Sequence, residues 1–143
     1  MRFIITSTTA DGTSKTEAAF DEKIFKAYMR FNEELHNAGV LVASEGLLPG
    51  TPGARIVASG GQRKVVDGPF AESKELVGGF YVIDVPSFED AKAWALRCPV
   101  GMAAANVLEI RQLTGAEDIP QPFLDMAASV APKWTASALT KKK

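Results

Sequence analysis

The residues best suited to chemistry lie in one acidic stretch between two apolar runs. This stretch extends from Asp67 to Glu75 and leads to Gly78-Gly79-Phe80. A simple chain reversal needs only two residues, so about ten residues that include three carboxylates and a lysine indicate a further role. Asp67, Glu72 and Glu75 are therefore our candidate catalytic residues.

Three further charged side chains are expected to join these carboxylates around one cleft mouth. They are Glu45, at the end of a neighbouring strand, and Arg111, on the last strand, together with Lys74 of the stretch itself. If two carboxylates lie close together, the pKa of one rises, and that group can act as an acid or base near neutral pH. Lys74 or Arg111 would then stabilise a developing anion during proton transfer, isomerisation or hydrolysis of a small polar substrate.

A purely structural interpretation of the same stretch stays open. Asp-Gly-Pro is ordinary turn chemistry, because Asp bonds nearby backbone, Gly accepts unusual dihedral angles and Pro fixes φ. Glu72, Lys74 and Glu75 can pair with one another or with Arg111 and only stiffen a long loop. Phe70 is either a ligand contact or an anchor that packs the loop onto the core.

The composition limits the classes of function. A chain of 143 residues suits a single domain, and its net charge of −1 provides no field that would attract nucleic acid or an anionic membrane. The single cysteine, Cys98, and the single histidine, His36, cannot form a disulfide or a usual zinc site, so we expect no metal and no cofactor. Without an apolar run long enough for a bilayer, the cytoplasm is the expected location.

Hydrophobic periodicity predicts the order of elements. A strand at 2–7 is followed by a helix at 20–38 that Gly39 ends, and later by a helix that begins after Ser87 and ends before Pro99. Strands are expected at 40–43, 54–58, 63–67, 79–85 and 106–113, with Gly60-Gly61 as a hairpin turn. This order predicts an α+β fold, a split βαβ arrangement with an additional hairpin inserted in the middle.

Several strands carry apolar residues at successive positions, which point to opposite faces of a sheet, as in the runs 3–5, 40–42 and 80–83. Strands that are buried on both faces have this pattern. Two helices can cover only one face of the sheet, so we expect a second copy of the chain to pack on the other face. The sequence therefore predicts a homodimer.

The residues at 114–143 differ in sequence pattern from those before them. We therefore expect a domain at 1–113 and a C-terminal extension at 114–143. A short helix between Pro122 and Pro132 is expected to place Phe123, Met126 and Val130 on one face. This face is expected to pack on the domain at 1–113, either of the same chain or of the second copy. The basic end at 141–143 is expected to be solvated.

Several of these segments together resemble the YCII-related superfamily, and specifically its DGPF-domain branch. The resemblance rests on the segments 38–41, 45–49, 67–75, 78–80, Ala91 with 94–95, and 109–111, which occur in the expected order. It implies a ferredoxin-like fold that dimerises face to face as a dimeric α+β barrel, with a cleft that takes a small molecule. It does not supply a reaction.

The resemblance also bears on the site and on partners. In the wider superfamily a histidine on or beside the first helix and an aspartate have been suggested as an acid-base pair. Tyr28 stands at the histidine's position here, and we take it as a ligand-binding candidate; His36 is expected on the opposite side of the helix. Family association also leaves open a non-catalytic regulatory or protein-partner module linked to bacterial transcription.

Overall fold

The computed structural model describes residues 1–8, 21–47, 53–68, 77–102 and 107–139. These residues form six strands and four helices, with one short 3-10 helix. In chain order they are β1 (Arg2–Thr8), α1 (Glu22–Asn37), β2 (Leu41–Gly46), β3 (Ala54–Ser59), β4 (Gln62–Asp67), β5 (Val77–Asp84), α2 (Phe88–Ala95), β6 (Val107–Gln112), η1 (Ala116–Asp118), α3 (Gln121–Val130) and α4 (Pro132–Ala138).

Four of the strands form one antiparallel sheet in the order β2-β5-β1-β6. With α1 after β1 and α2 after β5, this is the split βαβ topology, and the predicted ferredoxin-like α+β fold is confirmed. Among the described strands, the inserted β3 and β4 pair only with each other, in a separate hairpin. Gly60 and Gly61 make its turn, and both have positive φ as a two-residue hairpin turn requires.

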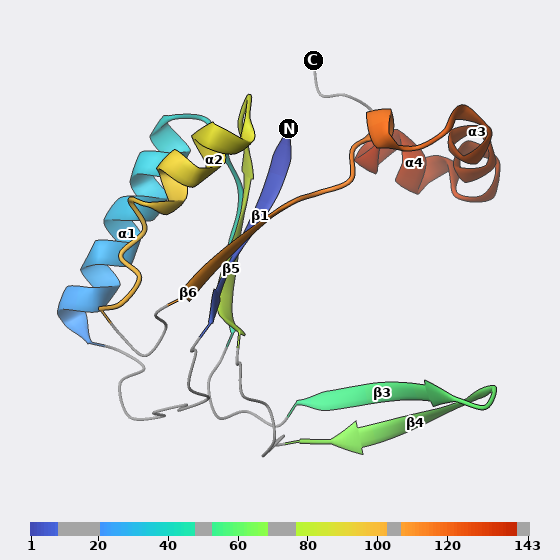
Figure 1. Ribbon diagram of the computed structural model, residues 1–143, viewed down its shortest axis with the longest axis horizontal. Helices are drawn as coiled ribbons and strands as arrows, with labels where there is room; N and C mark the ends of the chain where they lie inside the picture. The colour runs from blue at the N-terminus through green and yellow to red at the C-terminus, as the bar shows by residue number, and fades with distance from the viewer. Residues whose placement is uncertain (9–20, 48–52, 69–76, 103–106, 140–143) are drawn as a thin grey trace.

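Helices α1 and α2 cover one face of the sheet (Figure 1). Asp21 begins α1, because its side chain accepts a hydrogen bond from the Ile24 backbone N–H, and Gly39 follows its end at φ 71°. Alternate strand residues point toward these helices, so the buried core lies in this layer and consists of Phe3, Ile5, Phe31, Leu35, Tyr81, Ile83, Val85, Ala91, Ala95 and Cys98.

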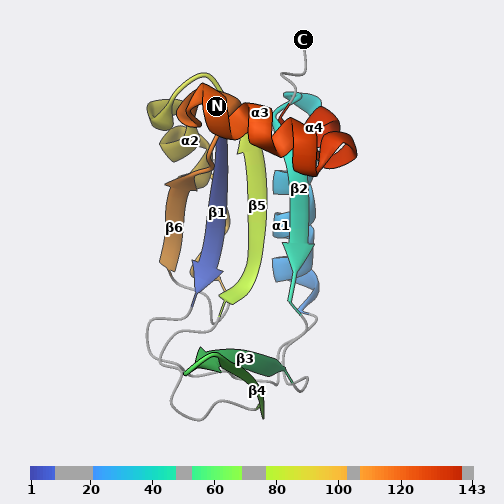
Figure 2. The ribbon, with the colours of Figure 1, turned by 90° about the vertical axis from the view of Figure 1, so that its right-hand side faces the viewer.

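No described helix or strand packs over the centre of the opposite face of the sheet, which faces the viewer in Figure 2. The register places Ile4 beside Val82, and Thr6 beside Phe80, all on the side away from α1 and α2. Ile4, Phe80 and Val82 are partly exposed, whereas their neighbours Phe3 and Ile83 are fully buried. Because successive residues of β1 and β5 are apolar, the sheet has a second apolar surface on this side, which we call the open face.

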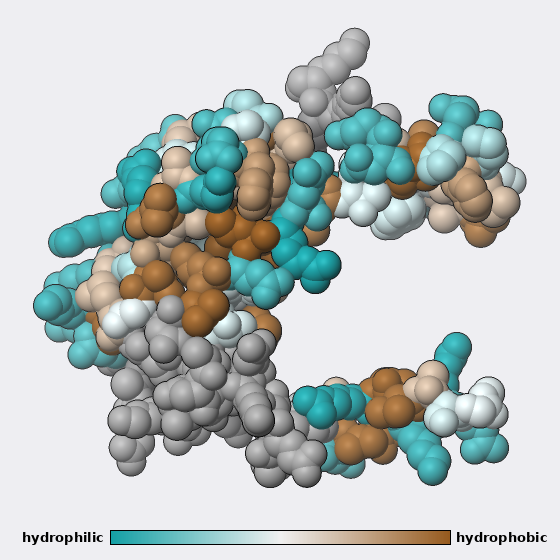
Figure 3. All heavy atoms as spheres, viewed as in Figure 1, coloured by the Kyte–Doolittle hydropathy of each residue, from teal (hydrophilic) through white to brown (hydrophobic). Residues whose placement is uncertain are grey.

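Two projections flank the open face on the same side of the sheet (Figures 1 and 3). The hairpin of β3 and β4 extends from one end of the sheet, and the C-terminal helices α3 and α4, which we call the helical arm, extend from the other end. Each packs mainly against itself, since α3 contacts α4 and β3 contacts β4. The space between them is open in the space-filling view.

The C-terminal segment contains one helix more than the sequence analysis expected. The sequence predicts that Pro132 ends the preceding helix, and α3 does end at Val130. Proline also fits the first turn of a helix, where its missing N–H would have no intrahelical partner. Pro132 accordingly begins α4 immediately after Ala131.

Candidate functional site

The open face is our candidate binding surface because it places charged side chains around an apolar centre. One row across the sheet contains Glu45, Phe80, Thr6 and Glu109, in the order of the strands. The next row contains Ala43, Val82, Ile4 and Arg111. Side chains that are directly opposite on paired antiparallel strands share one face. The centre of the surface is therefore apolar and both edges are charged.

Two of the predicted ligand-binding residues, Glu45 and Arg111, lie on this surface. Both are exposed, on the edge strands β2 and β6. Two strands separate these edges, so the residues lie about 14 Å apart or more within one protomer. The Arg111 Nε is 4.0 Å from the Glu109 Oε1 on its own strand. One protomer thus presents both residues on one face without bringing them into contact.

Gly79 allows the strand that carries Glu45 to approach closely. A Cβ at Gly79 would lie 2.8 Å from the backbone oxygen of Glu45, so any larger residue would push β2 away from β5. The Gly79 carbonyl oxygen also accepts a hydrogen bond from the Ser7 hydroxyl, at 3.4 Å. In the sequence, the adjacent glycines at 78 and 79 are the signal for this close approach.

Asp67 lies on a different element from the other candidates. It is exposed at the end of β4, opposite Ala54, where the hairpin meets the rest of the chain. The Gly68 N–H closes this end with a hydrogen bond of 2.7 Å to the Gly53 carbonyl oxygen. The remaining predictions for this stretch, Phe70, Glu72, Lys74 and Glu75, lie outside the described residues.

Tyr28 lies on the other side of the sheet from Glu45 and Arg111. It is half-buried on α1, where it packs against the core. Burial, and to a smaller extent the neighbouring Cys98 thiol, raises the pKa of Tyr28 above its ordinary value. Burial likewise raises the pKa of Cys98 to about 11, so both groups stay protonated at neutral pH. His36 is exposed in the last turn of α1.

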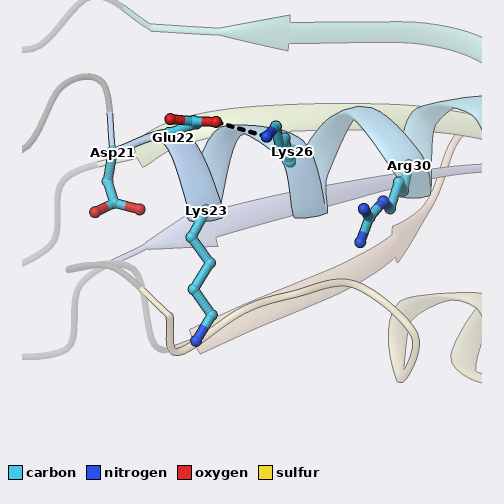
Figure 4. Close-up of a pocket in the computed structure, with 5 residues that line it drawn as sticks. All are labelled: Asp21, Glu22, Lys23, Lys26 and Arg30. Atoms are coloured by element: carbon cyan, nitrogen blue, oxygen red, sulfur yellow. Dashed lines mark hydrogen bonds and ion pairs between the residues drawn. The ribbon is translucent and has the colours of Figure 1, made fainter.

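The structure also has an open depression that the sequence analysis missed, at the start of α1 (Figure 4). Its volume is about 470 Å³, and the described residues that line it are Asp21, Glu22, Lys23, Lys26 and Arg30. Lys26 pairs with Glu22 one turn earlier, while Lys23 and Arg30 point to another side of the helix. Spaced cations on one helix are typical of a solvated surface, and this depression is separate from the open face.

The described residues contain neither a metal-binding cluster nor a membrane-spanning helix. Within the ranges that the structure describes, no three His, Cys, Asp or Glu side chains lie close enough together to hold a metal ion. No described helix combines the length and apolar character that crossing a bilayer requires.

Comparison with known proteins connects this structure to a family. The model of the YCII-related domain family matches residues 1–115, which contain the whole sheet and both covering helices. An uncharacterized protein of Rhizobium meliloti (strain 1021) is 33% identical over 101 residues, which cover 71% of this chain and 82% of that relative. Helices α3 and α4 follow the matched residues.

Proposed function

We propose that this chain, which belongs to the YCII-related family, is a cytoplasmic homodimer that binds a small polar molecule between the open faces of its two copies. The family itself is one of uncharacterised function. The single observation that carries the proposal is the open face, where an apolar centre with charged edges has no described element packed over it. A single cysteine suits the reducing environment of the cytoplasm.

The apolar centre of the face supports dimerisation. Ile4, Phe80 and Val82 lie side by side on the two central strands, and each remains partly exposed in one protomer. Full burial of a side chain of this size is favourable by about 1.5–3 kcal/mol relative to exposure. A second sheet, packed at the usual distance of about 10 Å, would cover all three.

The charged edges support the choice of ligand. Glu45 on one edge, and Glu109 with Arg111 on the other, offer both signs of charge around an apolar floor. Binding sites commonly combine apolar walls with a few polar groups that fix the ligand's orientation. A small molecule that carries both an acidic and a basic group, or several hydroxyls, fits this pattern.

A reaction at this site would use carboxylate acid-base chemistry. In this proposal Asp67, Glu72 and Glu75 supply the acid and the base, and Lys74 stabilises the anion that forms. The position of Asp67 supports this arrangement. Asp67 ends β4, and the hairpin lies at the end of the sheet where β2 also ends (Figure 1).

The experiment is a screen of small metabolites by thermal shift. The wild type is compared with the double variants Glu45→Gln/Arg111→Gln, at the edges of the face, and Asp67→Asn/Glu72→Gln. The matched control is Glu89→Gln/Lys92→Gln, which removes an exposed ion pair from α2 in the helix layer. A ligand should stabilise the wild type and the control but neither of the other variants. If every ligand stabilises all four proteins equally, or stabilises none, the binding proposal is wrong.

A second candidate is a protein-partner module, linked to bacterial transcription through the family association. It is favoured by the exposed apolar residues of the hairpin and the helical arm, such as Ile56, Val65 and Phe123. Sedimentation of the purified protein with a bacterial sigma factor of the extracytoplasmic-function class tests it. A mixed complex would support this function, and independent sedimentation would contradict it.

A further inference from the structure

Strand β2 contains a β-bulge in its first half. Leu41 lies opposite Ile83 on β5, but Ala43, two residues later, lies opposite the next residue of β5, Val82. Val42 is therefore an extra residue on β2 that has no partner of its own on β5. The regular ladder between the two strands is interrupted at this point.

The backbone hydrogen bonds next to the bulge show the same shift. In a regular antiparallel ladder with the observed pairing of Ala43, the Asp84 N–H would bond to the carbonyl oxygen of Leu41. The Asp84 N–H instead bonds to the carbonyl oxygen of Val40, at 2.8 Å. This difference of one residue equals the extra residue of the bulge, so the register and the hydrogen bonds agree.

The bulge decides which side chains of β2 reach the open face. Successive residues of a strand point to opposite faces, so one extra residue reverses the facing of every residue that follows it. With the bulge, Glu45 lies opposite Phe80 on the open face. Ser44 lies opposite Tyr81 on the helix side. In a regular ladder continued from the start of β2, Glu45 would lie opposite Gly79 and would point toward the helices.

Ser44 stabilises the bulged register from the helix side. Its hydroxyl donates to the Asn32 Oδ1 on α1, at 3.4 Å, and a further hydrogen bond joins it to the Tyr81 hydroxyl. Tyr81 is buried and makes an edge-to-face contact with Phe31. In the regular register Ala43 would replace Ser44 opposite Tyr81. The buried tyrosine hydroxyl would then lose this partner, which costs free energy.

Strand β2 needs this support because it is held from one side only. Among the described strands, β2 lies at an edge of the sheet and pairs with β5 alone. A strand's register is strongly specified where a slip would move apolar residues out of the core. After the bulge, β2 offers only Ala43, Ser44, Glu45 and Gly46. The hydrogen bonds of Ser44 therefore supply the discrimination that hydrophobic burial does not.

We propose that Ser44 is a positioning residue for the ligand site, because it fixes the bulged register that directs Glu45 to the open face. This inference rests on the proposed function, in which Glu45 binds part of a small polar molecule. Ser44 lies on the other side of the sheet and does not touch that molecule. A carboxylate only accepts hydrogen bonds, so Glu45 selects a donor group, such as an ammonium, a guanidinium or a hydroxyl.

NMR spectroscopy of the full-length protein reads the register without a ligand. In an antiparallel sheet the Hα atoms of a non-hydrogen-bonded pair lie close together. The bulged register gives a cross-peak between the Hα atoms of Tyr81 and Ser44, whereas the regular register gives one between Tyr81 and Ala43. In Ser44→Ala the ratio of regular to bulged register should rise about tenfold, as expected for the loss of one buried hydrogen bond. Relaxation dispersion measures the minor register.

Two matched variants separate this effect from the loss of a hydroxyl in general. Ser44→Thr keeps a hydroxyl at the same position and should keep the wild-type register. Ser7→Ala removes a hydroxyl from β1, where the Ser7 Oγ donates to the Gly79 carbonyl oxygen at 3.4 Å. Because Ser7 is not on β2, this substitution should leave the register of β2 unchanged.

Titration with arginine connects the register to binding. Free arginine has a guanidinium group that pairs with a carboxylate, and its own carboxylate suits Arg111. The apparent dissociation constant should rise in inverse proportion to the fraction of molecules that keep the bulged register. In a Glu45→Gln background, Ser44→Ala should cause no further loss of affinity, because both substitutions act through the same side chain.

The outcomes separate this inference from the proposed function. If arginine does not bind the wild type, or binds Glu45→Gln equally well, the ligand class assigned to the open face is wrong, and so is the role of Ser44. If Glu45→Gln weakens binding but Ser44→Ala keeps the wild-type register or the wild-type affinity, the positioning role alone is wrong. A parallel loss of register and affinity in Ser44→Ala supports both.

Discussion

Replacing Val82 by lysine should separate folding from dimerisation. Val82 lies at the centre of the open face, between Ala43 and Ile4, and is partly exposed in one protomer. Full burial of an exposed valine is worth about 1.5–3 kcal/mol, but Val82 is already partly covered in one protomer, so dimerisation adds only about 1 kcal/mol for each copy, and two-fold symmetry counts the residue twice. Val82→Lys therefore removes about 2 kcal/mol of apolar burial from the dimer, which raises the dissociation constant by about one to two powers of ten.

Sedimentation equilibrium over a range of concentrations measures this constant, and urea unfolding of the same samples reports the fold. The matched substitution is Ile83→Ala at the next position on β5. Ile83 is fully buried on the helix side, so its truncation should cost about 2–5 kcal/mol of folding stability. The protein that remains folded should keep the wild-type association constant.

The proposed dimer surface fails this test if Val82→Lys sediments like the wild type while the wild type is dimeric. In that case the dimer would use another surface. It also fails if Val82→Lys unfolds the protein as severely as Ile83→Ala does, because a side chain on an open face has no close-packed neighbours to displace.

Three further predictions concern the fold and the buried thiol. Gly79→Ala should lower the free energy of unfolding in urea by about 1–3 kcal/mol, since its Cβ would lie 2.8 Å from the Glu45 backbone oxygen. The control Gly46→Ala, whose Cβ would meet nothing within 4 Å, should be near neutral, and equal stabilities of the two variants would contradict the contact. Stability should fall as pH rises from about 9 toward 11, because the Cys98 thiol ionises first in the unfolded chain, while burial holds its pKa in the folded protein at about 11. Cys98→Ala should flatten the stability curve over the same range, and an unchanged slope would refute this assignment. Ser87→Ala should lower the free energy of unfolding by about 1 kcal/mol, because the Ser87 Oγ accepts a hydrogen bond from the Asp90 N–H at the start of α2. Ser87→Asp should keep most of the wild-type stability, and equal losses for the two variants in chemical denaturation would exclude a capping role.

Local chemistry made much of the sheet predictable from sequence. Gly39 ends α1 and Gly60-Gly61 turns the hairpin because both positions need positive φ, which glycine adopts without steric cost. The open face was anticipated because Ile4 and Val82 alternate with buried residues of equal hydrophobicity. These features depend on residues that are close in sequence.

Features that depend on strand order could not be derived in the same way. Glu45 and Arg111 were expected at one cleft mouth, but β5 and β1 lie between their strands and place them on opposite edges of one protomer. Tyr28 packs against the core on the helix side of the sheet, so its separation from Glu45 and Arg111 depends on which face of the sheet α1 covers. The close approach at Gly79 needs the pairing of β2 with β5, a contact between segments far apart in the chain.

The inserted hairpin is self-contained among the described strands. Its ladder pairs β3 with β4, and the Gly68 N–H bonds to the Gly53 carbonyl oxygen at its base, so none of the four strands of the sheet depends on it for pairing. Substitutions at its exposed positions can therefore change the surface that the protein presents without altering the register between β2 and β5.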